Sequence, residues 1–442
     1  MHILLLSINY WPEQTGIGLF NAWRAEYLAS RGHQVTVCTG LPYYPEWKIP
    51  REYAGKLVSR EEHNGVTILR SWQWVPKRVT PIKRVVFEAS FLATSFVRAL
   101  CSSKPDLLFV VSPPLGLGIT ANLLSRWWSV PYVFDVEDLQ PDAAADLGML
   151  PRPVLPVLYR MERFAYRHAA LISTLTEGMR RRIISKGVAA EKVAIFPMRA
   201  DEQLFKLGAA AEGQSFRLEH QLEGKFLVVH SGNMGVKQGL DVVLEAAALL
   251  KDRKNVAFLL VGSGAVKSQL EERAAALGLE NLKFLPLQSE QRFVQMLATT
   301  DLALVTQQRT VSDIAFPSKT VTLLSAGCPV LASVSSSSEV ARVIETSGGG
   351  VVVKPEEPAI LAQTIDQLSR NADQLSVMKS QARRYAMEKW SPDRVLPVME
   401  AELLKAARMP EGSGRTQLVP FGKTGPATTN FATERILPDA DD

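Results

Sequence analysis

The sequence predicts an α/β protein made of two doubly wound, Rossmann-like domains that face each other across an interdomain cleft. The chain has 442 residues, too many for one ordinary hydrophobic core and enough for two domains of roughly 200 residues each. Its apolar runs are short, unbroken and separated by helical patterns, as in parallel sheets covered on both faces. A strand, a glycine-containing turn and a helix follow one another twice, at residues 3–31 and 226–250.

The first of the two domains is predicted to comprise residues 1–207. Residues 3–8 form a continuous apolar run, and residues 18–31 follow with apolar side chains at helical spacing until Gly32 ends the helix. Further strands are predicted at residues 35–38, 107–111, 132–135 and 170–173. Helical patterns lie between them, which is typical of a βαβ series.

A polar stretch at residues 208–224 is predicted to be the linker, and residues 225–390 are predicted to form the second domain. Its strands are expected at residues 226–231, 258–261, 282–285, 302–305, 330–333 and 351–353. Residues 391–408 are expected to form a helix that packs back on the first domain. The tail at 409–442 is rich in Gly, Pro, Thr and Asp, so we expect it to be disordered.

Composition indicates a globular cytoplasmic enzyme. Hydrophobic residues make up 46% of the chain and charged residues 21%, which excludes a disordered or multi-spanning protein. The three cysteines lie far apart and form neither a CxxC pair nor a disulfide framework, as expected in a reducing cytoplasm. Residues 1–8 lack a basic segment and a cleavage site, so we expect a buried strand instead of a secretory leader. Residues 85–100 are short for a membrane span and contain Glu88 and Arg98.

The net charge of +5 is unevenly distributed along the chain. Residues 1–200 contain 24 Lys and Arg against 16 Asp and Glu, whereas residues 201–400 contain 21 against 23. A basic first half suits either an anionic lipid surface or an ordinary solvated surface. Because no nucleic-acid-binding motif accompanies these cations, no nucleic-acid partner is predicted.

Two glycine-containing turns are candidate anion sites. Gly16 and Gly18 follow the first strand and open a helix, where free backbone N–H groups and the positive helix end face outward. The third glycine of a dinucleotide fingerprint is missing, so a tight turn explains them equally well. In the second domain Gly232 and Asn233 open the corresponding turn. Lys237 adds a positive charge there, although a solvent-facing lysine is the alternative.

Pro317, Ser318 and Lys319 precede a predicted helix at residues 320–326. Ser318 suits the N-cap, and Lys319 would lie in the first turn. A lysine at this end opposes the helix dipole at a cost of roughly 0.3–1 kcal/mol, which a bound diphosphate would reverse. A lysine turned to solvent is the alternative.

Four carboxylates follow the predicted strand at residues 132–135. Clustered acids repel one another, so their burial would be costly without a purpose. Glu137 and Asp138 are the candidates for orienting an acceptor hydroxyl or taking its proton. Asp135 and Asp142 are explained equally well by capping or by a solvated loop.

Residues 70–84 mix two tryptophans with five Lys or Arg, and an apolar helix follows to residue 100. This mixture suits the interface of an anionic membrane. A core helix with a basic rim explains it equally well.

Taken together, these segments resemble glycosyltransferase family 4, retaining enzymes of the GT-B fold, and within it the colanic acid and related cell-surface polysaccharide transferases. The resemblance covers residues 1–405. It rests on INYWPEQTGIG (8–18), SPP (112–114), VEDLQPDAAADLGM (136–149), TEGMRRRIISKGVAAEKVAIFP (176–197), HSGNMGVKQGLD (230–241), LLVGSG (259–264), FPSK (316–319), SAGCPVLA (325–332) and SEVARVIE (338–345).

The resemblance implies a nucleotide diphosphate sugar held mainly by the second domain and a saccharide acceptor, lipid-linked by our expectation, on the first. Gly16 and Gly18 would approach the donor phosphate, and Gly264 would contact the donor. Lys237 and Lys319 would neutralise the diphosphate, so neither a metal site nor a cofactor is predicted. The enzyme would be a hexosyltransferase at the inner face of the cytoplasmic membrane.

The sequence departs from the family pattern in three places. Asn233 stands where many members have Arg, and Pro197-Met198 stands where Pro-Asn is usual. The family's Glu-x7-Glu pair would fall at Ile314 and Thr322, so both carboxylates are missing, and Glu339 is our candidate replacement for one of them. Two other functions therefore stay open: a nucleotide-sugar 2-epimerase of the same fold, and an inactive nucleotide-binding subunit of a polysaccharide assembly complex.

Overall fold

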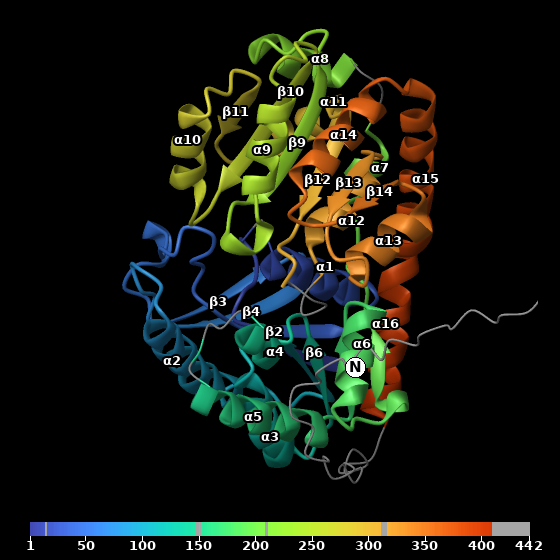
Figure 1. The fold of residues 1–442 in the computed structure, drawn as a ribbon. Helices are drawn as coiled ribbons and strands as arrows, with labels where there is room; N and C mark the ends of the chain where they lie inside the picture. Colours follow the sequence, from blue (N-terminus) through green and yellow to red (C-terminus); the bar gives the residue numbers. More distant parts are fainter. Residues whose placement is uncertain (14–15, 147–149, 151, 208–210, 311–315, 409–442) are drawn as a thin grey trace, which may run out of the picture.

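The computed structural model describes residues 1–13, 16–146, 150, 152–207, 211–310 and 316–408. It contains two α/β domains with mainly parallel sheets, which lie one above the other in Figure 1. The predicted fold class of two Rossmann-like domains is thereby confirmed. The tail at residues 409–442, for which disorder was expected, lies outside the described residues.

The amino-terminal sheet has the strand order β3-β4-β2-β1-β5-β6-β7-β8. Its strands are β1 (His2–Leu6), β2 (Gln34–Gly40), β3 (Val58–His63), β4 (Val66–Ser71), β5 (Leu107–Ser112), β6 (Tyr132–Val136), β7 (Leu171–Thr174) and β8 (Val193–Ile195). All neighbours are parallel except β3 and β4, which form a hairpin that the sequence analysis missed. Asn64 and Gly65 both have positive φ at its turn, as a two-residue hairpin loop requires.

The carboxy-terminal sheet has the order β11-β10-β9-β12-β13-β14, and its neighbouring strands are parallel. Its strands are β9 (Phe226–Asn233), β10 (Val256–Ser263), β11 (Leu282–Leu285), β12 (Leu302–Thr306), β13 (Val330–Ser333) and β14 (Gly350–Val353). Because all of them run the same way, the segments that follow them gather at one edge of the sheet.

Helices cover both faces of each sheet, so most strand interiors are apolar. In the amino-terminal domain, α1 (Ile17–Ser30) packs on one face, and α2 (Pro81–Leu100), α3 (Leu117–Trp128), α5 (Leu155–His168) and α6 (Glu177–Ser185) pack on the other. The carboxy-terminal domain has α9 (Asp241–Leu249), α10 (Lys267–Ala276) and α14 (Pro358–Ser369) on one face. Its other face carries α11 (Glu290–Thr299), α12 (Ser318–Ser325), α13 (Glu339–Ser347) and α15 (Ala372–Trp390). Short helices α4 (Gln140–Asp146) and α7 (Glu202–Phe205) lie between these elements.

The chain crosses between the domains at two neighbouring points. One crossing lies near Ala200 and the other near Trp390. The Ala200 amide donates to the Trp390 carbonyl at 2.7 Å, so the two crossing segments are hydrogen-bonded to each other. After Trp390, helix α16 (Pro392–Ala407) runs down beside the amino-terminal domain (Figure 1). It buries Leu396, Met399 and Leu403 in the same apolar cluster as β1 and β5. The last helix of the chain therefore completes the core of the first domain.

The expected linker at residues 208–224 is wrong in part. Residues 211–219 form helix α8 (Ala211–Glu219), which packs on α11. Phe216 and Leu222 are buried, and Arg217 forms an ion pair with Asp301 at 2.7 Å. These contacts make the segment part of the carboxy-terminal domain, because a polar stretch can form a helix when one apolar side chain per turn finds a partner.

The basic, aromatic stretch at residues 70–84 is buried at its start and exposed only in its later part. Arg70 is fully buried in β4, where its Nε lies 2.9 Å from a Glu61 carboxylate oxygen and its guanidinium lies over the Tyr53 ring. Only the cations from residue 77 onward are exposed. Across the described part of the chain, no helix is both long and apolar enough to pass through a bilayer.

We expect Leu403→Ala to lower the free energy of unfolding by about 2–5 kcal/mol, because it leaves a cavity between α16 and the amino-terminal sheet. Urea denaturation measures this loss. Val398→Ala is the matched control, since Val398 lies on the same helix with its side chain 52% exposed. If both variants unfold at the same urea concentration, α16 does not contribute to that core.

Candidate active site

The predicted donor-binding residues of the second domain lie at one edge of its sheet. Each follows the carboxyl end of a neighbouring strand. Gly232, Asn233 and Lys237 belong to the end of β9 and its loop, Gly264 follows β10, Ser318 and Lys319 follow β12, and Glu339 follows β13. This edge is where ligands bind in open α/β sheets.

The loop after β9 is fixed by backbone hydrogen bonds on both sides. The Met234 amide donates to the Ser263 carbonyl at 2.8 Å, and the Val266 amide donates to the Met234 carbonyl at 3.1 Å. The Gln308 amide donates to the Lys237 carbonyl at 2.9 Å. Lys237 therefore extends from a backbone that β10 and the segment after β12 hold in place.

Gly264 lies at this edge because two loops approach each other closely. A Cβ at Gly264 would lie 2.3 Å from the Met234 carbonyl oxygen, which no larger residue can accommodate. Gly232 is different: its φ is 124°, and nothing lies near the position of its Cβ. The packing of the loop thus explains Gly264, whereas Gly232 leaves open space beside its backbone.

Lys319 lies in the first turn of α12, as predicted, but it does not point into solvent. Its Nζ is buried and has no hydrogen-bond partner in the described part of the chain. Burial lowers the pKa of this ammonium to about 8. Among the described residues, no counter-charge accompanies this buried lysine.

His230 lies beside Lys319 and was not predicted as a site residue. Its side chain is fully buried, and neither ring nitrogen has a hydrogen-bond partner among the described residues. Burial and the Lys319 charge hold its pKa well below the usual range, and the nearby Asn233 backbone opposes them without reversing the shift, so the imidazole is neutral. The hydroxyls of Thr306 and Thr320 are also buried without a partner. A histidine inside an apolar strand was the signal available in the sequence.

Ser318 is not the N-cap of α12. Pro317 occupies that position, and Ser318 is the first helical residue and is exposed. The prediction failed because Pro317 has an extended backbone and supplies the cap without a side-chain oxygen.

Asn233 ends β9 with its side chain exposed. Of the two positions that lack the family's glutamates, Ile314 lies outside the described residues. Thr322 donates its hydroxyl to the Ser318 carbonyl at 3.3 Å within α12.

Glu339 begins α13 and is buried. Its carboxylate pairs with Arg342 one turn later, where Oε2 accepts from the Arg342 Nε at 3.0 Å. The Ser338 hydroxyl caps the same helix by accepting from the Ala341 amide. Glu339 is therefore already engaged within its own helix.

Asp138 follows β6 of the first domain and faces the second. Burial raises the pKa of its carboxyl to about 6, and the charges of Lys237 and Arg84 oppose that rise. The charge of Lys237 therefore acts on Asp138 across the domain boundary, so these two predicted catalytic residues lie within electrostatic range of each other.

Glu137, the other predicted carboxylate, points into the first domain. Arg24 from α1 donates to a Glu137 oxygen at 2.7 Å and to an Asp135 oxygen at 2.9 Å, and all three side chains are buried. Burial raises the pKa of Glu137, and Arg24 opposes the rise. Glu137 therefore joins α1 to β6, which identifies it as a residue that positions the loop carrying Asp138.

Gly16 and Gly18 lie where the sequence places them, but local packing explains both. Gly16 has a φ of 67° as the residue before α1. A Cβ at Gly18 would lie 2.9 Å from a Glu13 carboxylate oxygen. The other Glu13 oxygen accepts from the backbone amides of Tyr43 and Tyr44 at 3.1 and 3.0 Å. The loop after β1 is thereby tied to the loop after β2.

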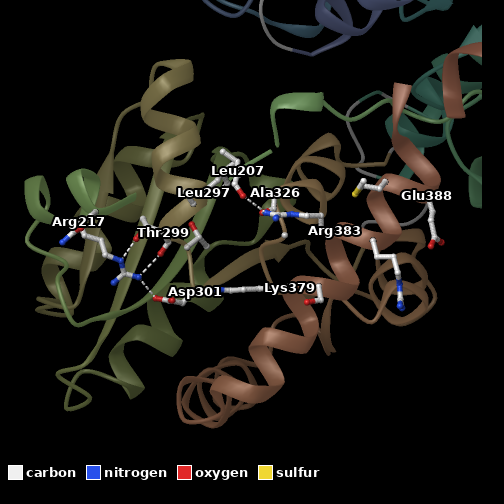
Figure 2. A pocket seen from close by; sticks show the side chains of 16 residues that line it. Leu207, Arg217, Leu297, Thr299, Asp301, Ala326, Lys379, Arg383 and Glu388 are labelled. Carbon is white, nitrogen blue, oxygen red and sulfur yellow. Dashed lines mark hydrogen bonds and ion pairs between the residues drawn. The ribbon is translucent and has the colours of Figure 1, made fainter. Parts of the chain in front are cut away.

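A large cavity of about 1390 Å³ lies elsewhere in the second domain. Its lining comes from α8, α11, α15 and the segment after α12, and Figure 2 shows Arg217, Thr299, Asp301, Ala326 and Arg383 among the residues around it. Arg217 donates there to the Thr299 carbonyl, and Arg383 donates to the carbonyls of Leu207 and Ala326. These cations are occupied in joining helices, and none of the predicted site residues lines this cavity. Within the described ranges, no three His, Cys, Asp or Glu side chains gather as a metal site.

Comparison with known proteins extends over nearly the whole chain. Residues 15–199 match the model of the glycosyl transferase 4-like domain, and residues 214–385 match the model of glycosyl transferases group 1. The chain is 34% identical over 404 residues to the putative colanic acid biosynthesis glycosyl transferase WcaI of Escherichia coli, covering 90% of this chain and 98% of that protein.

Solved structures show the same fold at lower identity. Anabaena HepE in complex with UDP has a TM-score of 0.69 at 18% identity, over 92% of this chain and all of that one. The lipopolysaccharide glycosyltransferase WaaG has a TM-score of 0.62 at 17% identity, over 91% of this chain and 99% of that one. Two parallel-sheet domains, two matching domain models and a relative similar along its whole length lead to one conclusion. This chain belongs to the glycosyltransferases of family 4, with the GT-B fold.

Proposed function

We propose that the enzyme transfers a hexosyl group from a nucleotide diphosphate sugar to a lipid-linked saccharide, with retention of anomeric configuration and without a metal ion. The reaction would take place at the inner face of the cytoplasmic membrane. The similarity to the colanic acid transferase supports a role in the synthesis of that polysaccharide or a related one. Solved neighbours contain UDP and UDP-glucose, which supports a nucleotide sugar as the donor.

The buried Nζ of Lys319 is the observation that carries the donor assignment. A buried ammonium without a partner is unfavourable, and a diphosphate oxygen would remove that cost. The neutral His230 beside it adds no competing positive charge and retains one N–H donor. Lys237 would meet the diphosphate from the loop after β9. The two lysines would thus supply the positive charge that stabilises the leaving group.

The chemical step follows from this placement. The acceptor hydroxyl oxygen attacks the anomeric carbon on the face from which the diphosphate leaves, and the bond from that carbon to the phosphate oxygen breaks. The hydroxyl proton passes to the departing phosphate, so the enzyme needs no separate base. Asp138, ionised above a pH of about 6, would accept a hydrogen bond that orients a sugar hydroxyl.

We expect UDP to bind most tightly at pH 7 and more weakly as the pH rises above about 8, because Lys319 then loses its charge. The slope should approach tenfold in Kd per pH unit for the loss of one proton. Isothermal titration calorimetry measures this dependence. Lys319→Arg should keep its affinity at high pH, since arginine stays protonated.

Lys319→Ala should weaken UDP binding roughly tenfold to a hundredfold, the effect of losing a charged hydrogen bond of about 1.5–3 kcal/mol. Lys379→Ala is the matched control, because Lys379 lies in the same domain but lines the distant cavity. Equal affinities of the two variants would remove Lys319 from the donor site.

We expect Asp138→Asn to lower kcat roughly tenfold to a hundredfold by disturbing the orientation of the acceptor. UDP affinity should stay unchanged. In the wild type kcat should fall below a pH of about 6, where Asp138 is protonated, and the variant should lack that decline. Glu137→Gln provides the contrast: breaking the buried pair with Arg24 should cost about 3–5 kcal/mol of stability. A retained acid decline in Asp138→Asn would contradict the assignment.

A further inference from the structure

Three neighbouring helices form the outer layer of the amino-terminal domain. Helices α2, α3 and α5 contact one another in sequence order, and Figure 1 shows α3 and α5 at the end of the molecule far from the second domain. Their inner faces bury aromatic and aliphatic side chains against the sheet. Their outward side chains form a surface that we call the outer helical surface.

The exposed positions of α3 are almost all apolar. Ile119, Leu123 and Trp127 lie four residues apart on one side of the helix, with side chains 39%, 50% and 72% exposed. Arg126 is the charged residue beside them. A stripe of this kind on a helix that already buries its opposite face is unusual for a surface that meets only water.

Helix α2 repeats the pattern. Ile82, Val86 and Val97 lie along its outward side, with exposures of 78%, 49% and 61%, and Ala89 and Ala93 continue the row between them. The charged side chains exposed on this helix are Lys83 and Arg84, and Arg84 is paired with Glu88.

Helix α5 contributes the main positive charge. Val157 and Phe164 are exposed on it together with three cations at helical spacing, Arg160, Arg163 and Arg167. Arg126 lies on the neighbouring helix α3. The acids of the three helices are withdrawn from this surface. Glu162 is buried against Lys186, and Glu88 is half-buried in a pair with Arg84. Among the described residues of α2, α3 and α5, no acidic side chain is fully exposed.

We propose that the outer helical surface docks on a bilayer containing anionic lipid. Apolar side chains can enter the boundary between headgroups and acyl chains, and the arginines can meet phosphate groups at the level of the headgroups. Each Lys or Arg near an anionic surface strengthens binding roughly fivefold. A surface without exposed acids matches this partner along all three helices, whereas an ordinary solvated surface mixes both signs of charge.

The position of this surface relative to the active site supports the same partner. Arg84, in the first turn of α2, acts electrostatically on Asp138. The start of the outer helical surface therefore lies within electrostatic range of the Asp138 carboxylate. The inference rests on the proposed function in one respect: a lipid-linked acceptor lying in that bilayer would reach the site from the start of α2.

Flotation with vesicles tests the proposal. The full chain should float with vesicles made of equal parts phosphatidylcholine and phosphatidylglycerol, and much less with phosphatidylcholine alone. Leu123→Ser with Trp127→Ser should weaken binding roughly tenfold or more, from the loss of two buried apolar side chains. Arg126→Glu with Arg160→Glu should weaken it roughly 25-fold or more. Leu249→Ser with Lys251→Glu, exposed positions of the second domain, should have no effect.

UDP-glucose binding, measured in parallel, separates this proposal from the proposed function. Every variant should bind the donor as the wild type does. A wild type that binds UDP-glucose but no vesicles overturns the docking surface alone, and one that floats but binds no donor overturns the donor assignment alone. Equal flotation of all variants also overturns the surface. A dimer in sedimentation that Leu123→Ser with Trp127→Ser dissociates would show that a second copy of the chain covers it instead.

Discussion

A buried positive charge that no described side chain neutralises is the constraint around which the strand ends of the second domain are arranged. The Lys319 ammonium lies beside His230, and within the described ranges the hydroxyls of Thr306 and Thr320 have no partner either. Native interiors seldom leave this many polar groups unpaired. The parallel strands hold these groups at one edge, and the backbone bonds of the loop after β9 prevent that edge from collapsing on itself. The enclosure is thus polar, and its loop is hydrogen-bonded to neighbouring segments, before any ligand arrives.

The first domain holds its part of the candidate site in place through buried ion pairs and hydrogen bonds. Arg24 fixes Glu137 and Asp135 beneath the loop that carries Asp138, and Glu13 joins the loops after β1 and β2. These buried pairs leave Asp138 as the carboxylate that meets Lys237. Fixed groups on both sides of the domain boundary suit a reaction in which electrostatic stabilisation depends on placement.

The strand–turn–helix repeats were sufficient to predict both domains, because buried parallel strands have a distinctive apolar pattern. The β3–β4 hairpin was missed because β3 (VSREEH) is polar after its first residue and so lacks the apolar run that marks a buried strand. Motif position located Lys237, Lys319 and Asp138 at the facing edges. It could not show that Arg24 engages Glu137, since an ion pair between distant segments leaves no local signal. The Glu339–Arg342 pair, three residues apart in one helix, did have a local signal, and the motif-based interpretation overlooked it. His230 was missed because its importance lies in being buried beside Lys319, and the sequence motifs do not show which side chains are buried together.

The return of α16 to the first domain has a consequence for synthesis on the ribosome. Leu396, Met399 and Leu403 complete a core that begins at residue 3, so the amino-terminal domain cannot finish folding when its own strands have emerged. It must wait, with apolar surface over β1 and β5 uncovered, until the chain has been translated to residue 407. The second domain, whose sheet is built from a contiguous segment, can mature earlier. The domain made first is therefore completed last.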